Sequence, residues 1–99
     1  MSPPSGALVI AGVGVEPFVK VHPGEADDIA RGAVLAALAD AAVDLDEVDL
    51  WVFGPRFEHP AIGQRTLCPL GATGPTVLNT ENACASGSVG VQIAAAYVT

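Results

Sequence analysis

Residues 76–98 read TVLNTENACASGSVGVQIAAAYV, and this stretch decides the fold. Its first part, Thr76-Val77-Leu78, is apolar and rich in β-branched residues, which predicts a buried strand. Its last part, from Val89 to Val98, consists of small and apolar residues compatible with a helix. The chain therefore turns sharply between a strand and the first turn of a helix, and the turn carries the thiol of Cys84.

The rest of the chain continues this alternation of elements. Strands are predicted over residues 7–15, 50–53 and 76–78, and helices over residues 25–43, 62–67 and 89–98. The order β-α-β-α-β-α indicates an α/β fold with a three-stranded parallel sheet and right-handed crossovers, and one domain over residues 1–99. Because residues 93–99 still read as helix interior without a Gly or Asn cap, we expect the front part of a larger fold, truncated or completed by another chain.

Two charge patterns support the helical part of this prediction. Acidic residues open the helix predicted over 25–43, and Asp27 is placed to pair with Arg31 one turn later. The run Asp44-Leu45-Asp46-Glu47 resembles a capping box, which predicts one further short turn.

Composition excludes several classes of function. The formal net charge is −7, with Lys20, Arg31, Arg56 and Arg65 as the only Lys or Arg residues, so no nucleic-acid binding is expected. The apolar stretches are too short for a membrane span, and no basic region precedes residues 7–11 as a secretory signal would require. Two cysteines without a spacing motif fit a reducing cytoplasm.

For most of the other candidate residues, the sequence pattern indicates a structural role. The pair Gly12 and Gly14 is a weak dinucleotide signal and favours close backbone packing, with a nucleotide-binding half-domain as the alternative. Cys68 is expected to be a small buried side chain. His22 and His59 are expected to be solvated loop residues, with a position facing a site as the alternative for His59. No metal site is predicted, because no third ligand accompanies the cysteines and histidines at a useful spacing.

The sequence around Cys84 indicates a chemical role for this residue. Its neighbours are small, so a substrate can approach, and backbone N–H groups and the positive end of a helix dipole favour thiolate over thiol. Residues 82–88 can present N–H groups to a developing oxyanion. Cys84 is therefore the predicted nucleophile. Turn and oxyanion support is expected from Asn82, Ala85, Ser86 and Gly87.

Residues 82–88, Asn-Ala-Cys-Ala-Ser-Gly-Ser, resemble the nucleophile motif of the thiolase superfamily. Residues 9–18 are similar to the first strand and turn of thiolases of the sterol-carrier and lipid-transfer type. Residues 63–65, Gly-Gln-Arg, and the later Gly71 also look like that group. The resemblance implies the N-terminal part of a duplicated, five-layer α/β fold.

The resemblance also implies chemistry and partners. It implies an acyltransferase in which Cys84 attacks a 3-ketoacyl-CoA thioester, coenzyme A being a substrate and no cofactor being held tightly. A homodimer, or a complex with a small OB-fold subunit, is expected. The family's histidine base and second cysteine cannot be matched to any residue of this chain.

Glu81 departs from the family pattern, because many thiolases have Asn at that position. A carboxylate beside the thiol opposes thiolate formation when both are ionised. This departure leaves room for one alternative, and the missing base and the uncapped last helix leave room for another. One is an aldolase-like lyase that cleaves sterol side-chain CoA adducts with a partner subunit. The other is a non-catalytic piece that supports assembly or binds lipid.

Overall fold

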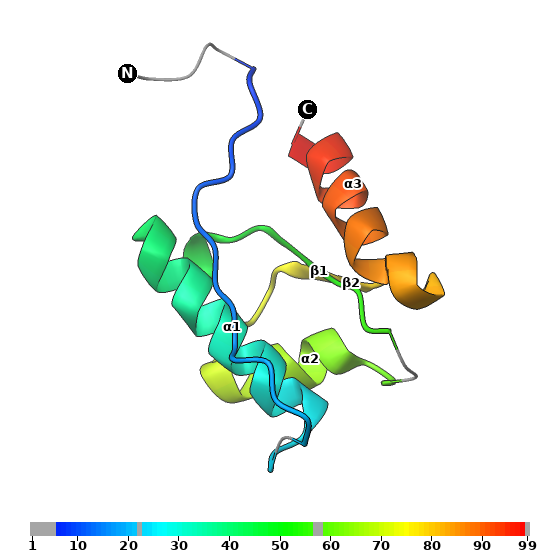
Figure 1. The fold of residues 1–99 in the computed structure, drawn as a ribbon. Helices are drawn as coiled ribbons and strands as arrows, with labels where there is room; N and C mark the ends of the chain where they lie inside the picture. The colour runs from blue at the N-terminus through cyan, green and yellow to red at the C-terminus, as the bar shows by residue number, and fades with distance from the viewer. Residues whose placement is uncertain (1–5, 22, 57–58, 99) are drawn as a thin grey trace.

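A small parallel sheet lies between helices on both of its faces (Figure 1). The computed structural model describes residues 6–21, 23–56 and 59–98. The α-helices and strands of these residues are α1 (Ala26–Ala41), β1 (Leu50–Phe53), α2 (Ile62–Leu67), β2 (Thr76–Asn79) and α3 (Ser86–Val98). The 3-10 turns are η1 (Leu45–Glu47), η2 (Cys68–Leu70) and η3 (Ala83–Ala85). The α/β class is thus confirmed, whereas the duplicated five-layer fold and the domain limits stay predictions.

The two strands pair in parallel, with Leu50 opposite Thr76 and Phe53 opposite Asn79. Successive side chains of β1 point to opposite faces of the sheet. A Cβ atom on Gly90 of α3 would lie 3.2 Å from Val52, and a Cβ on Gly63 of α2 would lie 2.7 Å from the Phe53 ring. The two glycines therefore let α3 and α2 approach opposite faces of the sheet closely.

Helix α1 follows the prediction from the sequence. Its first turn is acidic, as predicted, and it is shorter than the predicted range of residues 25–43. A capping box of Glu25 and Asp28, which was not predicted, precedes it, and Ala42 caps its end in a left-handed backbone conformation. The predicted pair of Asp27 and Arg31 is present, with 3.4 Å between the charged atoms. The capping box predicted for Asp44 is also present, at the start of η1.

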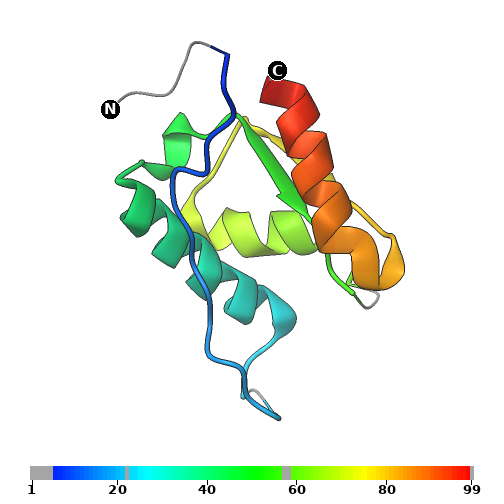
Figure 2. The ribbon, with the colours of Figure 1, turned by 45° about the horizontal axis from the view of Figure 1, so that its top comes forward.

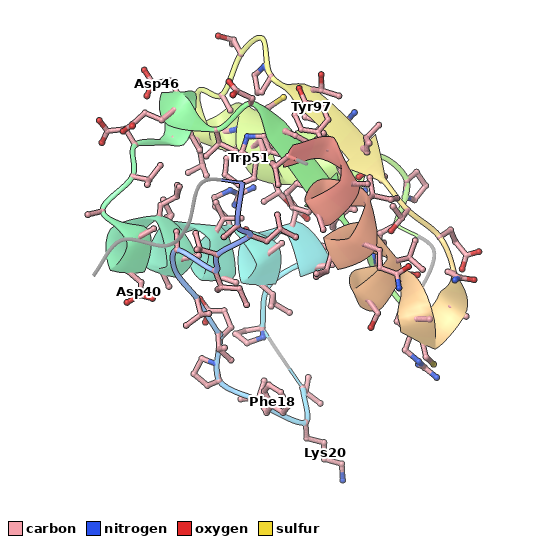
Figure 3. The ribbon with its side chains drawn as sticks, turned by 90° about the horizontal axis from the view of Figure 1, so that it is seen from above. Phe18, Lys20, Asp40, Asp46, Trp51 and Tyr97 are labelled. Atoms are coloured by element: carbon pink, nitrogen blue, oxygen red, sulfur yellow. The ribbon has the colours of Figure 1, made fainter. Side chains whose placement is uncertain are left out.

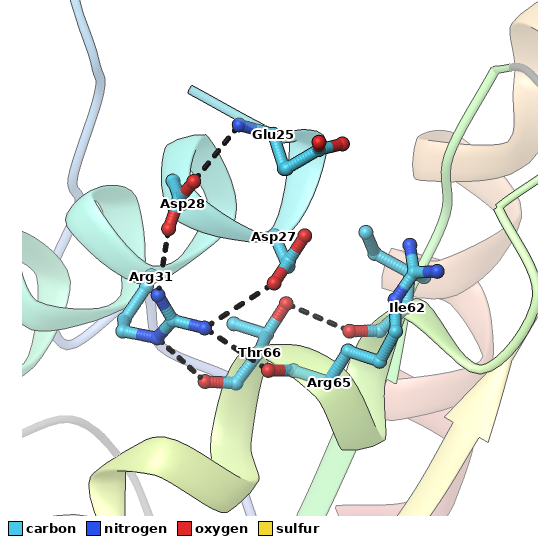
Figure 4. A network of polar contacts seen from close by, with 7 residues as sticks. All are labelled: Glu25, Asp27, Asp28, Arg31, Ile62, Arg65 and Thr66. Carbon is cyan, nitrogen blue, oxygen red and sulfur yellow. Dashed lines mark hydrogen bonds and ion pairs between the residues drawn. The ribbon is translucent and has the colours of Figure 1, made fainter.

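Arg31 joins α1 to α2 (Figure 4). Its Nε donates to the Thr66 carbonyl at 3.1 Å, and its NH2 group donates to the Arg65 carbonyl at 3.0 Å. Carbonyls near a helix C-terminus lack partners within the helix and carry partial negative charge, so a guanidinium suits them. The guanidinium is held in place by Asp27 and Asp28.

Residues 7–15 correct the predicted topology, because they form no strand and the sheet of the described residues has two strands, not three. The segment is extended and runs alongside α1 (Figure 2). A Cβ on Gly12 would lie 2.7 Å from the Ala37 carbonyl oxygen, and the Val13 N–H donates to the Asp40 carboxylate at 2.9 Å. The glycines thus serve close backbone packing, as expected, but against a helix and not within a sheet.

The buried core is small and centres on α2. Ile62, Thr66 and Leu67 are buried there. Trp51 and Phe53 are half-buried and stack with 6.5 Å between ring centroids. Cys68 is exposed, so its predicted burial is wrong. The reason is that the buried face of α2 holds residues 62, 63, 66 and 67, and position 68 lies off this face.

Candidate functional site

The carboxyl ends of both strands meet at one edge of the sheet. β1 continues there into residues 54–56, and β2 continues into residues 80–84. The Thr80 N–H donates to the Phe53 carbonyl at 2.8 Å, so the two strands stay together just beyond β2. Ligands of open α/β sheets bind at this edge, outside the carboxyl ends of the strands.

Arg56 and Cys84 meet at this edge although they are 28 residues apart in the sequence. The Arg56 Nε donates to the Cys84 Sγ at 3.3 Å, and both residues are exposed. Sequence reasoning singled out Cys84 and missed Arg56 as its neighbour. No local pattern signals this contact, since it depends on the pairing of β1 with β2.

The turn that carries Cys84 is fastened by the buried hydroxyl of Ser86. This hydroxyl accepts from the Asn82 N–H at 2.7 Å and donates to the Ala83 carbonyl at 2.8 Å. Ala83 has a left-handed backbone conformation, with φ of 50°, which is costly for a residue other than glycine. The hydrogen bonds of Ser86 hold this unfavourable turn in place.

Several N–H groups of the turn bond within the turn itself. The Ala83 N–H donates to the Glu81 carboxylate at 2.8 Å, and the Ala85 N–H donates to the Asn82 carbonyl at 3.0 Å. The Ser86 N–H donates to the Ala83 carbonyl. Glu81 is thus a local partner of the backbone at this turn. The oxyanion role of Asn82, Ala85, Ser86 and Gly87 stays a prediction.

An apolar hollow of about 290 Å³ adjoins Arg56, between the end of β1 and the beginnings of α1 and α2. Its wall contains Ile29, Phe53 and Ile62, and its polar members are Arg56 and His59. The remaining wall residues are Ala26, Ala30, Gly54 and Pro55. His59 is half-buried here, whereas sequence reasoning expected a solvated loop residue. His22, the other histidine considered, lies outside the described residues.

A larger depression of about 640 Å³ lies at the opposite, amino end of the strands. Asp46, Asp49, Thr73 and Thr76 are among the residues that line it. Its carboxylates and hydroxyls suit neither an apolar nor an anionic ligand. The apolar hollow is therefore the better candidate site.

The described residues contain neither a cluster of possible metal ligands nor a helix that could span a membrane. Among the described residues, no group of at least three His, Cys, Asp or Glu side chains is placed so that it could hold a metal ion. No helix among these residues is both long enough and apolar enough to cross a bilayer.

Comparison with known proteins gives relatives named for lipid transfer. No known protein-family profile matches the chain. It is 36 % identical over 94 residues to non-specific lipid-transfer protein-like 2 of Caenorhabditis elegans, covering 92 % of this chain. It is 37 % identical over 93 residues to sterol carrier protein 2 of Homo sapiens, covering 88 % of this chain. These proteins are homologues of the chain.

The match spans only a part of each relative. The aligned residues make up 23 % of the Caenorhabditis elegans protein and 17 % of the human protein. A further sterol carrier protein 2, from Gallus gallus, is 34 % identical over 84 residues, which is 15 % of its length.

The homologues correct the prediction of an enzyme. They are sterol carrier and lipid-transfer proteins by name, and none of the three is named as a thiolase or an acyltransferase. The prediction of a thiolase-like acyltransferase is therefore wrong. The resemblance to the sterol-carrier and lipid-transfer group holds, whereas its thiolase part is not supported.

Proposed function

We propose that this chain is a non-catalytic lipid-binding part of its protein. The apolar hollow holds the hydrocarbon part of the lipid, and Arg56 and His59 face its polar head. The observation that carries the proposal is this hollow, in which an apolar wall adjoins an exposed cation at the carboxyl edge of the sheet. The names of the homologues, a lipid-transfer protein and sterol carriers, support it.

The chemistry of the wall fits an amphipathic ligand. Burying apolar surface gains roughly 25 cal/mol per Å², so a hydrocarbon tail that buries about 200 Å² gains about 5 kcal/mol before the cost of association. The half-buried side chains of Ile29 and Phe53 offer such a surface. The guanidinium of Arg56 is a strong donor to a carboxylate or phosphate, so it favours a lipid with an anionic head.

A fatty acid or an acyl-CoA meets this description. For an acyl-CoA, coenzyme A is the head group of the bound lipid, and the acyl chain enters the hollow. Arg56 is one cation, whereas coenzyme A carries several phosphate charges, so other residues must hold the rest of that head group. A homodimer or a small OB-fold subunit is a proposed source of them.

A fluorescence titration of the full chain tests the proposal. The probes are cis-parinaric acid, which is anionic, and dehydroergosterol, which is uncharged. Ala26→Phe fills the hollow from the start of α1, and Ala39→Phe is the matched control because Ala39 is an exposed residue of the same helix. We expect Ala26→Phe to weaken probe binding about tenfold and Ala39→Phe to leave it within about twofold, since about 1.4 kcal/mol of binding energy is a factor of ten.

A charge substitution separates head recognition from tail recognition. Arg56→Gln is expected to weaken binding of the anionic probe about fivefold and to leave the uncharged probe unaffected, because only the anion bonds to the guanidinium. Arg65→Gln, an exposed arginine of α2, is the control. Binding of both probes to Ala26→Phe with wild-type affinity contradicts the proposed site.

A further inference from the structure

The chain has a projecting apolar loop that the proposed lipid site does not use. We call residues 17–21, Pro-Phe-Val-Lys-Val, the tip. Phe18 is 96 % exposed and Val21 is 82 % exposed. Figure 3 shows Phe18 and Lys20 at the far end of a loop that extends away from the helices and the sheet. Large aromatic side chains are seldom almost fully exposed to solvent in folded proteins, so the position of Phe18 needs an explanation.

Residues 14–16, which lead into the tip, pack against α1. The Glu16 carboxylate packs against Gly32, where a Cβ atom would collide with it. Two residues earlier, Gly14 lies so close to the backbone of α1 that a Cβ there would collide with the Ala33 carbonyl. Because both contacts are made to a helix, the tip is presented from a defined position on the molecule.

A second hollow, of about 430 Å³, lies between residues 14–19 and α1. Ile29 and Ala30 of α1 line both this second hollow and the apolar hollow of the proposed lipid site. An apolar wall therefore continues from Phe18 along α1 to the lipid site. Such a path suits a lipid that moves between a bilayer and the protein.

The charges of the chain indicate which kind of surface the tip fits. Lys20 is the single lysine of the chain, and it makes no ion pair with another described residue. A lysine beside apolar side chains can place its ammonium at a lipid phosphate while its neighbours enter the acyl region. The net charge of −7 disfavours strongly anionic membranes, so the fitting surface is one of zwitterionic phospholipid.

We propose that the tip docks this chain on a phospholipid bilayer, with Phe18 and its neighbouring valines in the interface and Lys20 at a lipid phosphate. The proposal rests on the proposed lipid-binding function and adds the surface from which the lipid is taken or to which it is delivered. A convex apolar tip fits a deformable bilayer better than it fits a preformed protein pocket.

Sedimentation of the full chain with phosphatidylcholine vesicles tests the proposal. Phe18→Ser removes the largest apolar group of the tip, and Val91→Ser is the matched control because Val91 is 70 % exposed on α3, away from the tip. We expect the partition coefficient to fall about tenfold for Phe18→Ser, from the loss of one aromatic group in the interface, and to stay within about twofold for Val91→Ser. Lys20→Gln is expected to lower it about threefold, because the contact of the ammonium with a lipid phosphate is lost.

The outcomes separate this proposal from the lipid site itself. Phe18→Ser should titrate with cis-parinaric acid in solution as the wild type does, and Ala26→Phe should partition onto vesicles as the wild type does. If the wild-type protein binds the probe and does not partition onto vesicles, the docking proposal is refuted and the proposed lipid site is unaffected. An equal loss of partitioning in Phe18→Ser and Val91→Ser also refutes the docking proposal. So does a dimer that forms in solution without vesicles and that Phe18→Ser dissociates.

Discussion

Replacing Ser86 by Ala removes a hydroxyl oxygen that makes two hydrogen bonds within the turn around Cys84. Ser86 is 1 % exposed, and its hydroxyl bonds to the Asn82 N–H and to the Ala83 carbonyl. The substitution keeps the carbon skeleton of the side chain, so it leaves almost no cavity. Its effect therefore reports the two hydrogen bonds.

The expected cost follows from the exposure of the two partners. A hydrogen bond within a protein contributes about 1 kcal/mol net, and a buried group left unpaired costs about 1–3 kcal/mol. Asn82 and Ala83 are exposed residues, so water can replace part of what Ser86 provided. We therefore expect the free energy of unfolding to fall by about 1–2 kcal/mol, which lowers the Tm by about 5–15 °C in a domain of this size.

Urea unfolding and amide exchange measure this effect. Ser88→Ala, an exposed serine in the first turn of α3, is the control and should change the free energy of unfolding by less than about 0.5 kcal/mol. Exchange of the Asn82 amide should accelerate about tenfold in Ser86→Ala, because its acceptor is gone. If Ser86→Ala unfolds at the same urea concentration as Ser88→Ala, the fastening role of Ser86 is refuted.

Two further predictions concern packing and the helix junction. Gly63→Ala should lower the free energy of unfolding by about 1–3 kcal/mol, because its Cβ would meet the Phe53 ring at 2.7 Å, whereas Gly87→Ala in α3 has open space and should raise it by up to about 1 kcal/mol. Urea midpoints of the two variants moving in the same direction would contradict this. Arg31→Met removes the hydrogen bonds to the carbonyls of α2 and should lower the free energy of unfolding, measured with urea, by about 2 kcal/mol. Arg65→Met is the control, and an equal decrease in that variant would show that the loss of a positive charge, and not of these hydrogen bonds, is the cause.

Much of the fold could be predicted from local pattern. Helix α1 has the predicted acidic first turn, η1 has the predicted capping box, and α2 and β1 have the predicted limits. The strand predicted over residues 7–15 is wrong because an apolar extended segment reads the same whether it pairs with a sheet or lies on a helix. Gly12 and Gly14 permit both arrangements, and only the position of α1 selects one.

The candidate site was less predictable than the fold. The sequence alone determined that Cys84 follows a strand and precedes a helix, because propensity and small residues act locally. Only the tertiary structure decided that Arg56 contacts this thiol, that Phe53 and Ile29 share a hollow, and that Phe18 projects into solvent. Contacts between residues distant in the sequence depend on strand pairing and on how the helices pack, and no local pattern encodes them.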